Sequence, residues 1–400
     1  MPDFIRSVAV PFLEPGRDGS VEHWTPHIEP DRAWVADDGG RLVGNACVFS
    51  RDVTVPARPG RPCPVLPMAA ISGVGVYPSH RRQGILRRLM ASMLEDARDR
   101  GEVIAALLAS ESVIYGRFGF GLATTAQRTR INTRESRFDV PAGSGDIRLL
   151  EPDEASKVLP DLHDRCRRLR AGDPSRNDPV WAGTFTDAPQ DRGGMSGRMY
   201  AVAPDGFAVY RGQQADELDG YARVTVQSLY GETPEAEAAL WRFLFDLDLV
   251  REVVAERPVD DPLRWRLADP RQLRVTASAD ELWVCVLDTA AALQARGYER
   301  AGRLVLEIAP PASPVPGISK STIGRWVLEA GPDGASCRPA GGEQCDLRMG
   351  LADLGALYMG GVRASTLAAA GRVHEERPGA LAVADTVFMT TREPFCGTGF

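Results

Sequence analysis

Histidine and cysteine are scarce in this 400-residue chain, and neither is clustered. The five histidines are scattered, and the seven cysteines include no Cys-x-x-Cys pair. Zinc sites require such ligands close together, so no metal site is expected. An odd number of widely spaced cysteines indicates reduced thiols, which predicts a cytoplasmic protein.

Several motifs and long hydrophobic runs are also missing. No run of about 18 uncharged apolar residues occurs, so no transmembrane helix and no membrane partner are expected. The N-terminus lacks the basic and apolar regions of a secretory signal. Neither Gly-x-x-x-x-Gly-Lys-Ser/Thr nor Gly-x-Ser-x-Gly is present, which excludes a P-loop nucleotide hydrolase and a serine hydrolase elbow.

The charge balance is acidic and the length predicts more than one domain. A net charge of −7 argues against a general nucleic-acid binder and is compatible with a cationic small-molecule substrate. Apolar residues make up 44% and charged residues 25%, as in ordinary globular proteins. A chain of this length is expected to form two or three domains of about 100 to 200 residues each.

The most informative stretch is an apolar strand that leads into an arginine-rich turn and a helix. Residues 69–76 are small and apolar, and Pro78 ends them. Apolar residues then recur on one helical face from Ile85 to Ala97. The turn at 81–84 therefore lies where backbone N–H groups are unpaired and the helix dipole is positive, which favours a pyrophosphate. The alternative is an ordinary strand-to-helix connection with surface arginines.

The residues around this turn resemble a known superfamily. The GNAT superfamily of acyl-coenzyme A-dependent N-acyltransferases has Arg/Gln-x-x-Gly-x-Gly/Ala, and this chain has Arg-Arg-Gln-Gly-Ile-Leu at 81–86, so its sixth position departs from the pattern. That leucine, Ile-Tyr-Gly-Arg-Phe-Gly-Phe-Gly at 114–121 and a terminal phenylalanine resemble the enhanced intracellular survival (Eis) family of broad-specificity amine acetyltransferases. The resemblance is specific from about residue 71 to 125 and at the C-terminus.

The resemblance implies an α/β (α+β) protein with tandem GNAT folds, mixed sheets with flanking helices, and a C-terminal sterol-carrier-protein-like domain. We expect an N-terminal GNAT domain at 1–146, a central degenerate GNAT domain at 147–289 and the last domain at 290–400. The Pro-Ala-Gly-Ser-Gly-Asp stretch at 141–146 predicts the first boundary, and a strand at 124–133 is expected to close the first domain. The central domain repeats the order of elements without the arginine turn, so we expect it to bind no cofactor.

Acetyl-coenzyme A is the expected co-substrate. Free backbone groups of Val74 and Val76 are expected to pair with its pantetheine arm, and the resemblance places Ser110 and Glu111 near the pantetheine or the adenine. The alternative role for Ser110 and Glu111 is capping of the short helix that follows. The full expected cofactor-binding set is Val74, Gly75, Val76, Arg81, Arg82, Gln83, Gly84, Ile85, Leu86, Arg87, Ser110 and Glu111.

The resemblance assigns roles in the transfer reaction to three further residues. Tyr115 is the expected general acid that protonates the leaving thiolate, and a phenol of pKa about 10 is protonated at pH 7. The α-carboxylate of Phe400 is expected to accept a proton from the amine, and Trp24 is expected to line the amine pocket. The alternatives are a packing tyrosine, a frayed terminus and a core tryptophan.

The sequence thus predicts a cytoplasmic N-acetyltransferase that acts on small polycationic amines such as aminoglycosides, by direct attack in a ternary complex. No covalent acyl-enzyme is expected, because Cys47 and Cys63 are the cysteines nearest the turn and neither has a partner base. Two alternatives are a protein-lysine acetyltransferase and a non-catalytic lipid or acyl-coenzyme A binding protein. The resemblance also implies a homohexamer.

Overall fold

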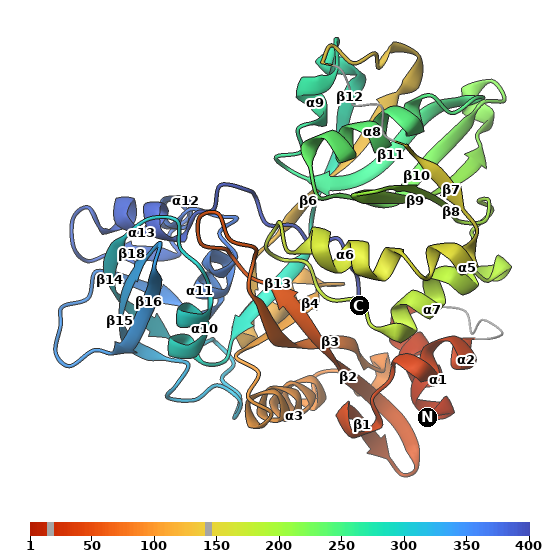
Figure 1. Ribbon diagram of the computed structural model, residues 1–400. Helices are drawn as coiled ribbons and strands as arrows, with labels where there is room; N and C mark the ends of the chain where they lie inside the picture. Colours follow the sequence, from red (N-terminus) through yellow and green to blue (C-terminus); the bar gives the residue numbers. More distant parts are fainter. Residues whose placement is uncertain (14–19, 141–145) are drawn as a thin grey trace. The chain divides into compact units, whose positions relative to one another are not determined.

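The computed structural model describes residues 1–13, 20–140 and 146–400. The chain forms two compact units (Figure 1). The first unit consists of residues 1–124, 171–175 and 280–400, and the second consists of residues 125–170 and 176–279. Each unit is therefore assembled from segments that are distant in the sequence. The boundary expected from 141–146 falls largely on residues 141–145, which lie outside the described residues.

The first sheet of unit 1 takes one of its strands from late in the sequence. Its order is β1-β2-β3-β4-β13-β5 (Figure 1). These strands are β1 (Ala33–Asp38), β2 (Arg41–Thr54), β3 (Val65–Val76), β4 (Ile104–Leu108), β13 (Leu282–Val286) and β5 (Gly121–Leu122). Strand β13 pairs antiparallel with both β4 and β5, so residues of the expected central domain complete the N-terminal sheet.

Helix α3 (Ile85–Asp99) packs against this sheet as its apolar pattern predicts. Its buried residues are Ile85, Leu89, Met90, Met93, Leu94 and Ala97. A short loop after β3 contains the 3₁₀ turn η3 (Pro78–His80) and leads into α3. The other helices before residue 125 are α1 (Pro2–Phe12), α2 (Ser20–Trp24) and α4 (Ser112–Tyr115). The predicted strand, turn, helix and strand order from 69 to 109 is therefore confirmed.

A fully buried arginine anchors α3 to the sheet. The Arg32 guanidinium is 0% exposed and donates to Glu102 at 2.7 and 2.8 Å, to Asp96 of α3 at 2.9 Å and to Ser50 of β2 at 2.9 Å. The two carboxylates balance its charge, and fixed hydrogen bonds of this kind hold a buried ion in one geometry. This network fixes the position of the helix that follows the arginine turn at 81–84.

The strand expected at 124–133 to close the first domain belongs instead to the second sheet, which lies in unit 2. Its order is β12-β6-β11-β10-β9-β8-β7. The strands are β12 (Leu273–Asp280), β6 (Thr125–Asn132), β11 (Val250–Pro258), β10 (Ala222–Gly231), β9 (Gly206–Gln214), β8 (Met199–Ala203) and β7 (Arg148–Leu150). Strand β6 pairs with β11 and does not close the first sheet, because β13 takes the place between β4 and β5.

Two segments of unit 2 are each divided by a turn. The apolar pattern predicts one helix over 151–170, but the structure forms two, α5 (Pro152–Ala155) and α6 (Leu159–Arg167). The pattern likewise predicts one strand over 199–209, but this segment belongs to the hairpin β8–β9, with its turn at 204–205. The remaining helices of this unit are α7 (Asp178–Thr186), α8 (Pro234–Phe245) and α9 (Leu263–Arg266). A proline lies at each break: Pro160 is in the first turn of α6, and Pro204 is in the turn of the hairpin.

The C-terminal part of unit 1 is a mainly antiparallel sheet covered by helices. The sheet order is β16-β15-β14-β17-β18. Its strands are β16 (Gly334–Pro339), β15 (Gly324–Gly331), β14 (Gly302–Ala309), β17 (Leu347–Gly350) and β18 (Val373–Glu375). The helices are α10 (Thr289–Ala295), α11 (Leu351–Tyr358), α12 (Ala364–Ala369) and α13 (Ala380–Phe388). Within this sheet β14 and β17 pair in parallel, and the other neighbouring strands are antiparallel.

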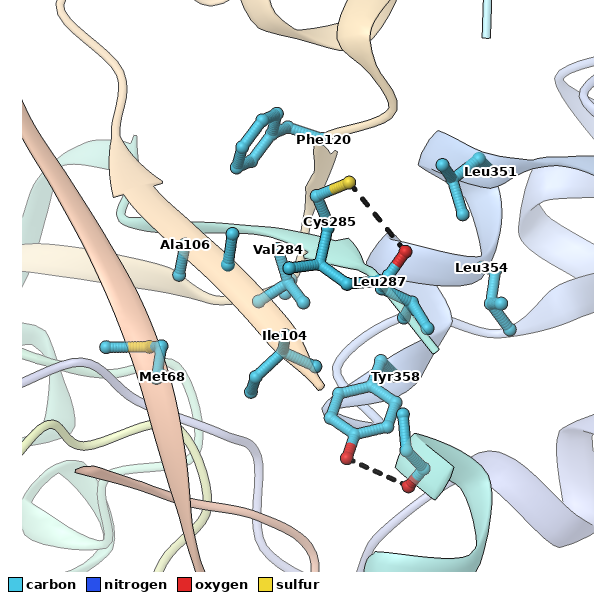
Figure 2. Packing of buried hydrophobic residues seen from close by; sticks show 14 of the residues in the cluster. Met68, Ile104, Ala106, Phe120, Val284, Cys285, Leu287, Leu351, Leu354 and Tyr358 are labelled. Carbon is cyan, nitrogen blue, oxygen red and sulfur yellow. Dashed lines mark hydrogen bonds between the residues drawn. The ribbon is translucent and has the colours of Figure 1, made fainter. Parts of the chain in front are cut away.

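Helix α11 joins the C-terminal part to the first sheet in one hydrophobic core. Figure 2 shows Leu351 and Leu354 of α11 packed beside Val284 and Cys285 of β13. The backbones approach so closely that a Cβ on Gly355 would lie 2.1 Å from the Val284 carbonyl oxygen. A Cβ at Gly121 would lie 1.7 Å from the Ala352 carbonyl oxygen. Glycine is therefore required at these two contacts.

Arg296 holds two helix ends together inside this core. Its guanidinium is almost fully buried and donates to the carbonyl oxygens of Tyr358 at 2.7 Å and Phe388 at 2.9 Å. These residues end α11 and α13, whose last carbonyls lack intrahelical partners and carry the negative end of the dipole. Burial lowers the pKa of Arg296 from its ordinary value. The arginine caps both helices.

We expect Arg296→Met to lower the free energy of unfolding by about 3 kcal/mol, because the substitution leaves several buried carbonyls unpaired. Denaturant unfolding of the two proteins measures the difference. Arg303→Met is the matched control: Arg303 forms an exposed ion pair with Glu329 at 3.5 Å, and its loss should cost less than about 1 kcal/mol. Equal effects of the two substitutions would contradict the capping role.

Candidate active site

Strands β3 and β4 pair over only three positions and then separate. The parallel register runs from Met68 opposite Ile104 to Ala70 opposite Ala106. Beyond this point β3 continues to Val76 and, among the described strands, pairs only with β2, while β4 continues to Leu108 beside β13. The edge of β3 that faces away from β2 therefore carries backbone groups free to pair with an extended ligand.

The free backbone groups belong to the residues that the sequence identified. The Tyr77 N–H donates to the Val43 carbonyl of β2 at 2.9 Å. Because backbone groups alternate in direction along a strand, those of Val76 and Val74 point away from β2. Gly75 lies between them, and a Cβ there would lie 2.6 Å from Pro11 of α1, so α1 requires this glycine.

A β-bulge shapes this edge of β3. Ser72 pairs with Cys47 and Gly75 pairs with Asn45, so Gly73 and Val74 oppose the single residue Ala46. Gly73 has φ of 59°, in the left-handed region that glycine adopts without strain. Bulges increase local twist, and this one lies where β3 leaves β4.

The first turn of α3 offers unpaired N–H groups to an anion. Gly84 is the N-cap, and no side chain caps the helix. Arg82 and Gly84 have φ of 63° and 74°, so the loop folds through two left-handed residues. Arg81, Arg82, Gln83 and Gly84 are all exposed. Within the described residues, neither Arg81 nor Arg82 has an ion-pair partner, so both guanidiniums are available to a phosphate.

The next three positions of the motif have more restricted roles. Ile85 is buried and Leu86 half-buried, and both pack in the core under the turn. The Arg87 guanidinium donates to the Pro314 carbonyl at 3.1 Å, so the proline-rich loop of the C-terminal part already engages it. This bond uses one of the five N–H donors of the guanidinium, so contact of Arg87 with the cofactor stays a prediction.

Tyr115 is the last residue of α4 and is 5% exposed. Its ring meets Phe120 edge-on, with 6.3 Å between ring centroids. Burial raises the pKa of the Tyr115 phenol above its ordinary value, while a hydrogen bond with Ser110 opposes this shift and the charge of Glu111 adds to it. The phenol is therefore protonated at neutral pH and able to donate a proton.

Ser110 and Glu111 are both exposed, and they follow the end of β4. Neither side chain caps α4: Glu111 is its N-cap, but no side-chain hydrogen bond is formed there. The capping alternative is therefore wrong. The contact of Ser110 with Tyr115 instead places it beside the expected acid. Their contact with the cofactor stays a prediction.

The C-terminal residues lie against the first sheet. A Cβ on Gly399 would lie 3.7 Å from Leu108 of β4, and Phe400 is half-buried against the same core. The Phe395 N–H donates to the Ala171 carbonyl at 2.9 Å, which holds the segment in place. Phe400 is thus docked near the end of β4, as expected, while its catalytic role stays a prediction.

Trp24 is not a core residue, because 40% of it is exposed. Its ring lies 5.3 Å from that of His23 and 5.4 Å from that of His27, centroid to centroid. Burial, followed by the charges of His23 and Arg51, lowers the pKa of His27 to about 4. These rings form an aromatic surface before β1, and its place in the amine pocket stays a prediction.

The sequence missed two side chains that lie next to the bulge. Asn45 is buried and donates to the Gly73 carbonyl, and the Cys47 thiol donates to the Ser72 carbonyl at 3.4 Å. Burial, with a smaller effect of Glu29, raises the pKa of Cys47 to about 12, so this thiol is not a thiolate nucleophile at neutral pH. A signal for Asn45 was available in the sequence, because it is the one polar residue in the apolar run 42–49.

The second fold repeats the first but closes the corresponding positions with its own side chains. Helix α8 is capped by Thr233, whose hydroxyl accepts from the Ala236 N–H at 3.1 Å. Strands β10 and β11 pair in parallel only as far as Val226. Beyond that point the buried Arg257 donates to the Leu229 carbonyl of β10 at 2.6 Å. This arrangement favours the expectation that the second fold binds no acetyl-coenzyme A.

Two negative findings apply to the part of the chain that the structure describes. Within 1–13, 20–140 and 146–400, no group of three or more His, Cys, Asp or Glu side chains is arranged to hold a metal ion. Over the same ranges, no helix is both long and apolar enough to cross a membrane. The expected absence of a metal stays a prediction.

Comparison with known proteins assigns the three parts of the chain. Residues 1–123 and 172–286 each match an acetyltransferase (GNAT) domain, and residues 289–397 match a sterol carrier protein domain. An uncharacterized N-acetyltransferase of Streptomyces avermitilis is 36% identical over 98% of this chain and 95% of its own length. The architecture is therefore that of a tandem GNAT acetyltransferase with a sterol-carrier-like domain. The protein is an acetyl-coenzyme A-dependent acetyltransferase.

The comparisons also show the family within this class. N-acetyltransferase Eis of Mycobacterium tuberculosis is 34% identical over 93% of this chain and 90% of its own length. The crystal structure of Eis1 from Mycobacterium abscessus superposes with a TM-score of 0.86 and 31% identity, covering 99% of this chain and 96% of that one. The chain belongs to the Eis family of GNAT N-acetyltransferases.

We expect Arg82→Gly to weaken acetyl-coenzyme A binding about tenfold, because it removes a charge-assisted donor and leaves the left-handed backbone intact. Calorimetric titration gives the dissociation constant, and thermal unfolding should show no loss of stability. Arg61→Gly, which removes an exposed arginine from the β2–β3 loop, is the control. Equal affinity of both variants for acetyl-coenzyme A would contradict an anion site at 81–84.

Proposed function

We propose that this enzyme acetylates amines of small polycationic substrates such as aminoglycosides, by direct attack in a ternary complex. The observation that carries the proposal is the separation of β3 from β4 directly before the uncapped first turn of α3. One edge offers backbone groups to pantetheine, and the turn offers N–H groups and arginines to pyrophosphate. Acetyl-coenzyme A supplies the acetyl group as an activated thioester.

The proposed roles of the protein groups follow from their chemistry. The Phe400 carboxylate, at the docked end of the chain, accepts a proton from the substrate ammonium, directly or through water. A C-terminal carboxyl has a pKa near 3.5, so it is ionised at neutral pH and attracts a cation. Tyr115 gives its phenolic proton to the departing sulfur, and its raised pKa keeps it protonated beforehand.

Two observations support the amine side of the proposal. The aromatic surface of His23, Trp24 and His27 suits the stacking of amines and sugar rings. The net charge of −7 favours a cationic acceptor.

The buried thiol of Cys47 remains protonated at neutral pH, which supports direct transfer without an acyl-enzyme.

The decisive experiment is an acetyl-transfer assay with wild-type protein, Tyr115→Phe and two altered C-termini. We expect Tyr115→Phe to lower kcat about 100-fold, the usual contribution of a positioned general acid. Deleting Phe400 or appending one glycine after it should lower kcat by at least tenfold. The appended glycine keeps the phenylalanine ring and moves only the carboxylate. Release of coenzyme A measures the rate.

The choice of acceptor separates the proposal from its alternatives. Wild-type protein is assayed with an aminoglycoside, a linear polyamine and a lysine-containing peptide. Preference for the peptide would identify a protein-lysine acetyltransferase. Binding of acetyl-coenzyme A without transfer to any amine would favour a non-catalytic binding protein. Full activity of both Tyr115→Phe and the C-terminal variants would contradict the proposed acid and base.

We further propose that the protein is cytoplasmic and assembles as a homohexamer, as the family resemblance implies. Light scattering on the purified chain should then give six times the 43.3 kDa mass of one chain. A monomeric mass at micromolar concentration would contradict the hexamer and leave the enzymatic proposal unaffected.

A further inference from the structure

Asn45 is a fully buried polar side chain in the middle of β2, beside the bulge of β3. It is 0% exposed and lies opposite Gly75 in the ladder. Its Nδ2 donates to the Gly73 carbonyl. Its Oδ1 lies 3.4 Å from the Ser7 hydroxyl of α1, which also donates to the Phe4 carbonyl at 2.7 Å. The bond to β3 therefore fixes the orientation of the amide, and the contact with α1 is the weaker one.

The bulge explains why an amide is needed at this position. Gly73 and Val74 together oppose one residue of β2, so the Gly73 carbonyl has no regular ladder position. Gly73 is half-buried, and a backbone carbonyl that is partly shielded from water needs a hydrogen-bond donor. Since a carbonyl can only accept, the nitrogen of the Asn45 amide must face it. Asn45 thus holds the Gly73 carbonyl toward β2.

Holding this carbonyl also sets the direction of the next N–H group. The Gly73 carbonyl and the Val74 N–H belong to one peptide unit, and the described chain has no cis peptide bonds. In a trans peptide the C=O and N–H point in opposite directions. With the carbonyl held toward β2, the Val74 N–H points to the side from which β4 has separated.

We propose that Asn45 is a positioning residue for acetyl transfer, which aims the Val74 N–H at the thioester carbonyl oxygen. The inference rests on the proposed function. Negative charge develops on this oxygen as the amine nitrogen forms its bond to the carbonyl carbon and the carbon–sulfur bond then breaks. A backbone donor already aimed at this oxygen stabilises that charge without reorganisation, and such donors typically contribute about 100- to 1,000-fold to kcat.

The test compares Asn45→Asp and Asn45→Ala with Thr54→Val. Asp keeps the shape of the side chain but replaces the donor with an acceptor, and Ala removes both. Thr54 is a matched control, because it is fully buried on the same strand and its hydroxyl accepts from the Asp173 N–H at 3.0 Å. Both Asn45 variants should lower kcat about tenfold or more, while the KM for the amine changes less than twofold.

A spectroscopic readout separates positioning from loss of stability. Infrared difference spectra of acetyl-coenzyme A labelled with ¹³C at the carbonyl should show a shift to lower frequency on binding to wild-type protein and to Thr54→Val. The shift should be smaller in both Asn45 variants. If these variants retain the wild-type shift and kcat, Asn45 has no positioning role. If wild-type protein neither binds nor turns over acetyl-coenzyme A, the proposed function fails as well.

Discussion

The short ladder between β3 and β4 is the constraint on which the proposed chemistry depends. Parallel pairing ends at Ala70 and Ala106, although both strands continue. A fully paired sheet would leave no backbone group free at this place. The bulge at Gly73 and the long pairing of β3 with β2 keep the free edge extended without β4. Two contacts in unit 1 support the separated strands. Arg32 bonds α3 to the sheet, and α11 packs closely against β13.

The two GNAT folds show how one scaffold can keep or close a binding site. In the first fold Gly84 begins α3 and leaves its N–H groups to a ligand. In the second fold the Thr233 side chain caps α8, and Arg257 donates a hydrogen bond to the Leu229 carbonyl of β10. Backbone polar groups that no ligand satisfies require an internal partner. The hydroxyl and the guanidinium supply such partners in the second fold, in agreement with the expectation that this fold binds no cofactor.

Most of the local elements could be predicted from the sequence. The apolar face from Ile85 to Ala97 predicts α3, and the resemblance at 81–86 and 114–121 predicts the superfamily and the family. The sequence could not reveal that β6 belongs to the second sheet and β13 to the first. Strand propensity predicts that a segment is a strand, but it does not predict which other strand the segment pairs with. Residues 106 and 284 pair although they lie far apart along the chain.

Sequence by itself determined the helix, the arginine turn and the acidic balance, because each follows from residue type and spacing over short distances. Only the tertiary structure decided that Asn45 meets the Gly73 carbonyl, that Cys47 lies beside β3 and that Phe400 docks near β4. The physical reason is that these contacts join segments from 25 to nearly 300 positions apart. Burial and pairing create them only when the chain has folded.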